Sequence, residues 1–184
     1  MMTISSKADI RKLPWPHMVV RDFLPAEMYQ AITSGTPNKV QTYTEDNCIK
    51  YNMIYQTDSA YLDVLTHLTD REFITDLYAK FDIEATKQTQ MLTCTLVDAQ
   101  PGFRLGAHTD LKDKPNLNLQ IYLSENNLHE TVKVHNLDIG STMCTEVPCQ
   151  PNLMWCFITS DKTWHTLPII KTNRVSILCK YGEK

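Results

Sequence analysis

The chain has 184 residues, of which 42% are hydrophobic and 21% are charged, and its formal net charge is −3. This composition is ordinary for a globular domain, and the near-neutral charge gives no electrostatic reason to expect nucleic acid or a membrane surface as a partner. The five glycines form neither GxGxxG nor GxxxxGKS/T, so a phosphate-binding nucleotide loop is not expected. We expect a single domain over residues 1–184, with a helical and peripheral-strand part at about 1–89 and a β core at about 90–182.

The first half of the chain predicts helices and a few short strands. PWPHMVV predicts an extended run, and a helix follows in LPAEMYQAIT, where Pro25 suits the first turn. Weak alternation of polar and apolar residues over 39–56 predicts one or two peripheral strands. A helix in DSAYLDVLTHL begins near Asp58, and the next helix begins at a capping box formed by Thr69 and Glu72.

From about residue 90 the pattern changes to short runs rich in β-forming residues. Pro, Asn, Asp and Gly separate these runs, which are QMLTCTLVD, LNLQIYLSE, TVKVHN, NLMWCFIT and RVSILCKYG. Five such runs with no helix between them indicate an antiparallel sandwich or jelly roll. We therefore expect a mainly β fold in which the N-terminal helices support one sheet from outside.

Nothing in the chain predicts export or a membrane span. The first 17 residues lack the apolar stretch of a signal peptide, and no segment approaches the roughly 18 apolar residues of a spanning helix. The six cysteines include no CxxC pair, and Cys156 and Cys179 lie in apolar runs typical of buried thiols. We expect a cytoplasmic protein with reduced cysteines.

The stretch GAHTDLKD contains two good metal ligands, His108 and Asp110, on alternate positions. Alternate residues of an extended segment project to the same side, so this pair can bind one metal ion. His165 follows the turn-like TSDKTW and is the best candidate for a third ligand. Two histidines and one carboxylate form the facial triad of non-haem Fe(II) enzymes. A surface turn with a chance histidine, and a strand-end histidine, remain the alternatives.

Arg174 begins the apolar run RVSILCKYG, nine residues after His165. An arginine at the head of a buried strand suggests an anionic partner, because a buried unpaired charge is unfavourable. Its planar guanidinium suits bidentate binding of a carboxylate, and Ser176 on the same strand face adds a hydroxyl. A salt bridge to a neighbouring Asp or Glu is the alternative interpretation.

The chain resembles the Fe(II)/2-oxoglutarate-dependent dioxygenases, and most of all their prolyl-4-hydroxylase-like branch. The resemblance lies in the order of three features: H-x-D, then a distal histidine, then R-x-S. Three further segments resemble that family: PWPHMVVRDFLP near the start, IYLSE, and TSDKTWHTL, which leads into and includes the distal histidine His165. The resemblance covers roughly residues 14–182 and implies a double-stranded β-helix, or jelly-roll, core with the N-terminal helices packed on one sheet.

The resemblance also implies a set of site residues. The iron ligands would be His108, Asp110 and His165, and these would also be the catalytic residues. The residues that bind 2-oxoglutarate would be Arg174 and Ser176 at the distal carboxylate, Tyr122 at the same carboxylate, and Gln120 in the pocket wall. The cofactors implied are Fe(II), 2-oxoglutarate and O2. The implied reaction is hydroxylation of a C–H bond in a peptidyl or small-molecule substrate, with release of succinate and CO2.

The chain departs from the family in two places. Ala99 stands where many members have a tyrosine, and NNLHETVKVHN replaces their Gly-Gly turn, so a prolyl substrate is not implied. His129 and His135 in that segment are expected at the surface or on the substrate side, and Trp164 is a candidate wall of the site. Two other functions stay open: a cupin-like metal enzyme that does not use 2-oxoglutarate, and a non-catalytic jelly-roll binding protein.

Overall fold

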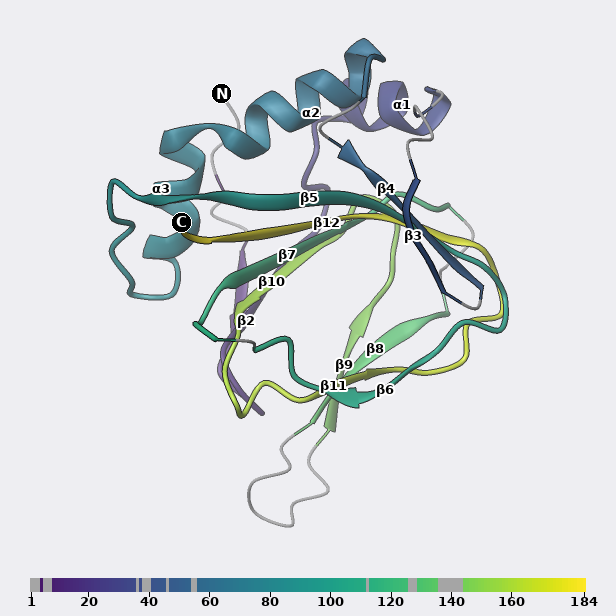
Figure 1. Cartoon of the computed structure of the whole chain (residues 1–184). Helices are drawn as coiled ribbons and strands as arrows, with labels where there is room; N and C mark the ends of the chain where they lie inside the picture. The colour runs from purple at the N-terminus through teal and green to yellow at the C-terminus, as the bar shows by residue number, and fades with distance from the viewer. Residues whose placement is uncertain are drawn as a thin grey trace.

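The computed structural model describes residues 4, 8–35, 37, 41–45, 47–53, 56–111, 113–125, 129–135 and 144–184. The larger of its two antiparallel sheets has the order β1 (Asp9–Arg11), β2 (His17–Val20), β10 (Met154–Ile158), β7 (Leu117–Tyr122), β12 (Arg174–Glu183), β5 (Thr89–Ala99), β4 (Cys48–Asn52) and β3 (Gln41–Glu45). The smaller has the order β6 (Leu105–His108), β11 (His165–Leu167), β8 (Thr131–His135) and β9 (Cys144–Pro148). The two sheets face each other (Figure 1), which confirms the jelly-roll prediction.

Three helices lie along the outer side of the larger sheet, away from the smaller one (Figure 1). They are α1 (Ala26–Ser34), α2 (Ser59–Thr69) and α3 (Arg71–Ala79). Their apolar stripes, such as Val64 and Leu68 of α2, are buried in one core with residues of the sheet's outer face. This arrangement confirms that the helices pack on one sheet.

Strand alternation divides the buried residues into two cores. On β10, Met154 and Cys156 face the helices, whereas Trp155 and Phe157 belong to a second core between the sheets. A strand that is buried on both faces is a continuous apolar run, as MWCFI is. The second core surrounds the site described below.

The capping-box prediction at Thr69 is wrong. Thr69 ends α2, and its hydroxyl donates to the carbonyls of Leu65 and Thr66. The N-cap of α3 is Asp70, whose carboxylate accepts from the backbone N–H of Phe73 at 2.9 Å. Thr69 and Asp70 are both residue types that favour an N-cap position. Asp70 is the N-cap of α3 because Thr69 is still the last residue of α2.

The five predicted β runs are all strands, and the region 39–56, where one or two peripheral strands were expected, contains β3 and β4. Four further strands, β1, β6, β9 and β11, have only three to five residues each and were not predicted. Cys94 and Cys179 lie opposite each other on β5 and β12, and all six cysteines are free. Within the described ranges, none of the helices has the length and apolarity needed to span a bilayer.

Candidate metal centre

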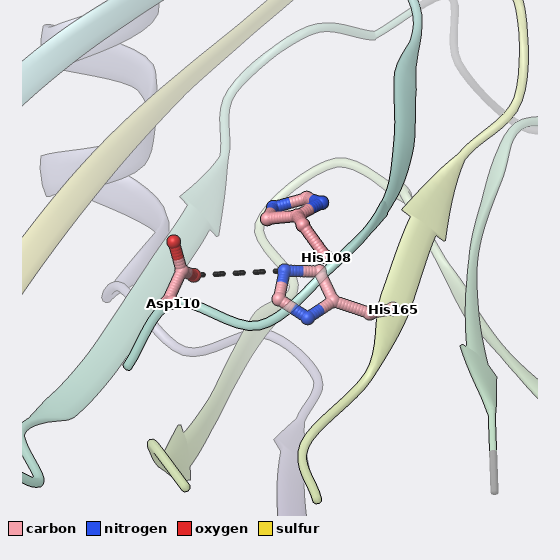
Figure 2. A group of neighbouring side chains, drawn as sticks. All are labelled: His108, Asp110 and His165. Atoms are coloured by element: carbon pink, nitrogen blue, oxygen red, sulfur yellow. Dashed lines mark ion pairs between the residues drawn. The ribbon is translucent and has the colours of Figure 1, made fainter. Parts of the chain in front are cut away.

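The smaller sheet brings the three predicted metal ligands together. β6 and β11 are antiparallel neighbours, and His108 lies directly opposite His165. Asp110 follows β6 on the loop and points back toward His165 (Figure 2). One potential ligand atom from each of the three side chains lies within 4.8 Å of the other two. The geometry is that of a potential three-ligand site on one side of an ion.

Backbone carbonyls set the tautomers of both histidines. His108 Nδ1 donates to the Gly106 carbonyl at 2.8 Å, and His165 Nδ1 donates to the Thr163 carbonyl at 3.0 Å. A carbonyl only accepts, so each Nδ1 carries the proton and each Nε2 is left with a lone pair. Burial is the largest influence on His165 and lowers its pKa, so the ring is neutral at pH 7.

His165 Nε2 therefore presents a lone pair to another acceptor. Its distance to Asp110 Oδ2 is 3.5 Å (Figure 2). Two acceptors in this position are best satisfied by a cation between them. A neutral imidazole and a carboxylate are also donors that divalent transition metals accept. The residues present thus fit a metal ion.

Two residues of the larger sheet hold the carboxylate of Asp110. Asn118 Nδ2 donates to Asp110 Oδ2 at 2.6 Å, and Lys180 Nζ lies 3.8 Å from Asp110 Oδ1. Asn118 and Lys180 are directly paired across β7 and β12. The larger sheet therefore positions a ligand that the loop after β6 supplies, as outer residues do at metal sites.

The three candidate ligands line a cavity of about 400 Å³ between the two sheets. Arg174 lines the same cavity and is only 3% exposed. Its Nη1 lies 3.9 Å from Cys149 Sγ, and its buried Nε has no hydrogen-bond partner among the described residues. In the described ranges no carboxylate forms an ion pair with Arg174. A buried guanidinium with free donors fits an anionic ligand in this cavity.

The other predicted pocket residues form one hydrogen-bonded network. Gln120 lines the cavity, and its Nε2 donates to Ser176 Oγ at 2.9 Å. Its Oε1 accepts from Trp155 Nε1 at 3.1 Å and from the Tyr122 hydroxyl at 3.4 Å. Tyr122 and Ser176 are fully buried and are not among the cavity-lining residues; the Arg174 guanidinium lies 5.8 Å from the Tyr122 ring centroid. Burial is the main cause that raises the pKa of Tyr122 well above its ordinary value.

Several cavity residues were not predicted from the sequence: Lys50, Asn118, Trp155 and Lys180. For two of them a signal was present. Asn118 has the same strand parity as Gln120, and Lys180 has the same parity as Arg174, so both share an inward face with a predicted residue. Trp155 lies on β10, and Lys50 lies on the peripheral strand β4. The positions of these two strands relative to the site depend on the strand order of the sheet.

Other residues singled out from the sequence lie away from the cavity. Trp164 is half-buried, and its carbonyl accepts from Trp15 Nε1. His129 is exposed, whereas His135 Nε2 is 2.8 Å from Thr166 Oγ1. In the segment after Asp110, Asp113 and Lys114 are exposed, and Lys112 lies outside the described residues.

No protein-family model and no curated protein match this sequence. Among solved structures, an oxidoreductase of the 2OG-Fe(II) oxygenase family from Burkholderia pseudomallei matches with a TM-score of 0.69 and 11% identity, covering 90% of this chain and 84% of that one. A Pseudomonas putida prolyl-4-hydroxylase has a TM-score of 0.65 and 13% identity, covering 91% and 92%. A Trichoplax adhaerens prolyl hydroxylase, solved with a hypoxia inducible factor peptide fragment, has a TM-score of 0.66 and 11% identity, covering 91% and 83%. This chain therefore has the jelly-roll fold of the 2OG-Fe(II) oxygenases and prolyl hydroxylases.

Proposed function

We propose that the protein is an Fe(II)- and 2-oxoglutarate-dependent oxygenase that hydroxylates a C–H bond of a peptidyl or small-molecule substrate, with release of succinate and CO2. One observation carries the proposal. A single cavity contains both a cluster of two histidines and one carboxylate and a buried arginine with no carboxylate partner among the described residues. The jelly-roll fold shared with 2OG-Fe(II) oxygenases supports it.

His108, Asp110 and His165 would hold the iron from one side and leave the other side of the ion open to the cavity. Bound Fe(II) would supply O2 activation coupled to the oxidative decarboxylation of 2-oxoglutarate. Asn118 keeps the Asp110 carboxylate in place, and the carbonyls of Gly106 and Thr163 keep both imidazoles in the metal-binding tautomer.

Arg174 would bind the distal carboxylate of 2-oxoglutarate through its guanidinium. Gln120 is held by Ser176 and Trp155, so this part of the wall is rigid before any ligand arrives. Buried apolar side chains such as Phe157 and Leu167 line the cavity and exclude water from it. A cupin-like enzyme without 2-oxoglutarate would leave Arg174 with no carboxylate to bind, and a non-catalytic binding protein would leave the cluster of His108, Asp110 and His165 without a metal ion, so the geometry favours both less.

The test begins with anaerobic addition of Fe(II) and 2-oxoglutarate to the purified protein. We expect the weak visible absorption band that Fe(II) gives on binding a 2-oxo acid. The band should be absent in Asp110→Ala and much weaker in Arg174→Ala at the same ligand concentration. Asn173→Ala, an exposed position outside the cavity, is the matched control and should keep the full band. A wild-type protein that binds neither iron nor 2-oxoglutarate would contradict the proposal.

A further inference from the structure

We infer that Glu130 positions Arg174 and thereby sets a preference for 2-oxo acids that carry a second, distal carboxylate. The inference rests on the proposed function, in which Arg174 binds the distal carboxylate of 2-oxoglutarate. The sequence analysis assigned no role to Glu130. It is not among the residues that line the cavity, so it acts through Arg174 and not on the ligand.

The carboxylate of Glu130 holds the turn that leads into β12. Its Oε1 accepts from the backbone N–H groups of Lys171 at 2.8 Å and Thr172 at 2.9 Å, and from the Thr172 hydroxyl at 3.0 Å. Thr172 is two residues before Arg174, the first residue of β12. Hydrogen bonds to an ionised acceptor are stronger than those to a neutral one, so this oxygen fixes the backbone just before Arg174.

The first residue of β12 needs this support because the sheet pairs it on one side only. Arg174 is paired with Ala99 of β5, whereas the ladder between β12 and β7 begins at Ser176. Glu130 directly precedes β8, so its side chain joins the turn to the smaller sheet. The direction in which Arg174 leaves the backbone therefore depends on both sheets.

A second contact ties Glu130 to the guanidinium itself. The Glu130 carbonyl accepts from the backbone N–H of Cys149 at 2.8 Å, and Cys149 Sγ lies 3.9 Å from Arg174 Nη1. Both charges act on this thiol: burial is the main cause that raises the pKa of Cys149, Arg174 lowers it, and Glu130 raises it. Glu130 thus holds Arg174 through the turn before it and through the thiol beside it.

Glu130 does this without occupying the donors of Arg174. Its second oxygen, Oε2, is buried and has no hydrogen-bond partner within the described ranges. Among the residues that the structure describes, no ion pair joins Glu130 to Arg174. An unsatisfied buried oxygen reduces stability, and proteins keep such groups where function depends on them. The guanidinium is held in place and stays available for a ligand.

The alternative role for Glu130 is to stabilise the turn with no effect on the choice of ligand. Two acids separate these roles. 2-Oxoglutarate and 2-oxopentanoate have the same carbon chain and the same metal-chelating end, but 2-oxopentanoate lacks the distal carboxylate. General damage to the site weakens the binding of both acids, whereas a misdirected Arg174 weakens the binding of 2-oxoglutarate alone.

Three variants distinguish reach from charge. Glu130→Ala removes the acceptor, and Glu130→Asp keeps the charge on a side chain that is one methylene shorter. Glu130→Gln keeps the length and one oxygen acceptor. Loss of a negative charge near an anion site would by itself strengthen the binding of 2-oxoglutarate, so weaker binding indicates lost positioning.

The experiment titrates the full chain with each acid under anaerobic conditions with Fe(II), and the visible absorption band gives each Kd. We expect Glu130→Ala and Glu130→Asp to bind 2-oxoglutarate roughly 10-fold more weakly, as when one charge-assisted contact loses its alignment, and to bind 2-oxopentanoate as the wild type does. Glu130→Gln should keep most of the preference for 2-oxoglutarate. The exposed Glu84→Ala, outside the cavity, is the matched control and should behave as the wild type.

Thermal unfolding shows whether each variant is folded at the temperature of the titration, and Glu130→Asp carries the test if Glu130→Ala does not fold. A wild-type preference for 2-oxoglutarate in the folded variants overturns the inference, as does an equal loss of binding for both acids. A wild type that gives no absorption band, or that binds both acids equally well, overturns the proposed function instead.

Discussion

Arg174 carries a buried positive charge, and its guanidinium Nε has no hydrogen-bond partner in the part of the chain that the structure describes. Tyr122 and Cys149 contact it, but neither supplies a negative charge, because burial raises the pKa of both groups. A group in this position weakens the ligand-free fold, and proteins keep such groups where a ligand needs them. Stability and binding should therefore respond in opposite directions at this residue.

Replacing Arg174 by methionine should leave the free energy of unfolding of the ligand-free protein unchanged or raise it, by up to about 4 kcal/mol, because it removes an uncompensated buried charge. The same variant should lose 2-oxoglutarate binding. Urea denaturation without ligand and titration with Fe(II) and 2-oxoglutarate measure the two effects. A large drop in stability would show that the guanidinium supports the fold and would count against its role as an anion site.

The histidines illustrate how a residue's neighbours decide its role. His165 and His17 are both buried, and each donates Nδ1–H to a nearby carbonyl. Nε2 of His165 faces Asp110, whereas Nε2 of His17 faces no partner in the described part of the chain. Of these two histidines, only His165 is therefore a candidate metal ligand, although both have the same ring chemistry.

At the scale of elements, β12 contributes side chains both to the site and to the core beneath the helices. Its inward residues include Arg174 and Lys180, whereas Ile177 and Cys179 face the helices. The strand lies between β5 and β7, and both neighbours fix its register. A slip by one residue would place the basic side chains in the apolar core, so the register of the site is strongly specified.

The junction of α2 and α3 offers a direct test of the corrected cap. Asp70→Ala should lower the free energy of unfolding by about 1 kcal/mol, because the N–H of Phe73 loses its side-chain acceptor. Thr69→Ala should have a smaller effect, since its exposed hydroxyl only donates back to carbonyls within α2. Urea denaturation of both variants provides the comparison. A larger loss of free energy of unfolding in Thr69→Ala than in Asp70→Ala would instead support the capping box expected from the sequence.

At the scale of the whole molecule, stability should depend on pH through buried histidines. Burial is the main cause that lowers the pKa of His17, His67 and His165 from 6.5 in the folded state. The unfolded chain then binds more protons than the folded chain below about pH 6.5. This contribution to stability is complete above the unfolded value and decreases as the pH falls toward the lowered folded values.

We expect the free energy of unfolding of the metal-free protein to fall between about pH 7 and pH 5, and His17→Phe to make this fall shallower. Phenylalanine keeps an aromatic ring packed against Trp15 but cannot bind a proton. Asp9 and Arg11 act on His17 in opposite directions, so the effect comes mainly from burial. The exposed His129→Phe is the control, and equal slopes in both variants would contradict this assignment.

The sequence by itself determined the features that depend on local patterns. The longer strands and the helices follow from hydrophobic periodicity, and the His108–Asp110 pair follows from strand parity. The family resemblance carried by that pair, His165 and Arg174 also implied that these side chains meet in one cavity. The structure places them there, although their binding of iron and 2-oxoglutarate stays a prediction.

Only the tertiary structure decided which side chains surround those ligands. Asn118 and Lys180 come to Asp110 because β7 and β12 are neighbours in the larger sheet, and no local pattern specifies that neighbourhood. The three-residue strand that holds His165 is too short to have a period of its own, so it forms only by pairing with β6 and β8. Periodicity within a segment shows which way side chains point, whereas pairing between distant segments determines what they meet.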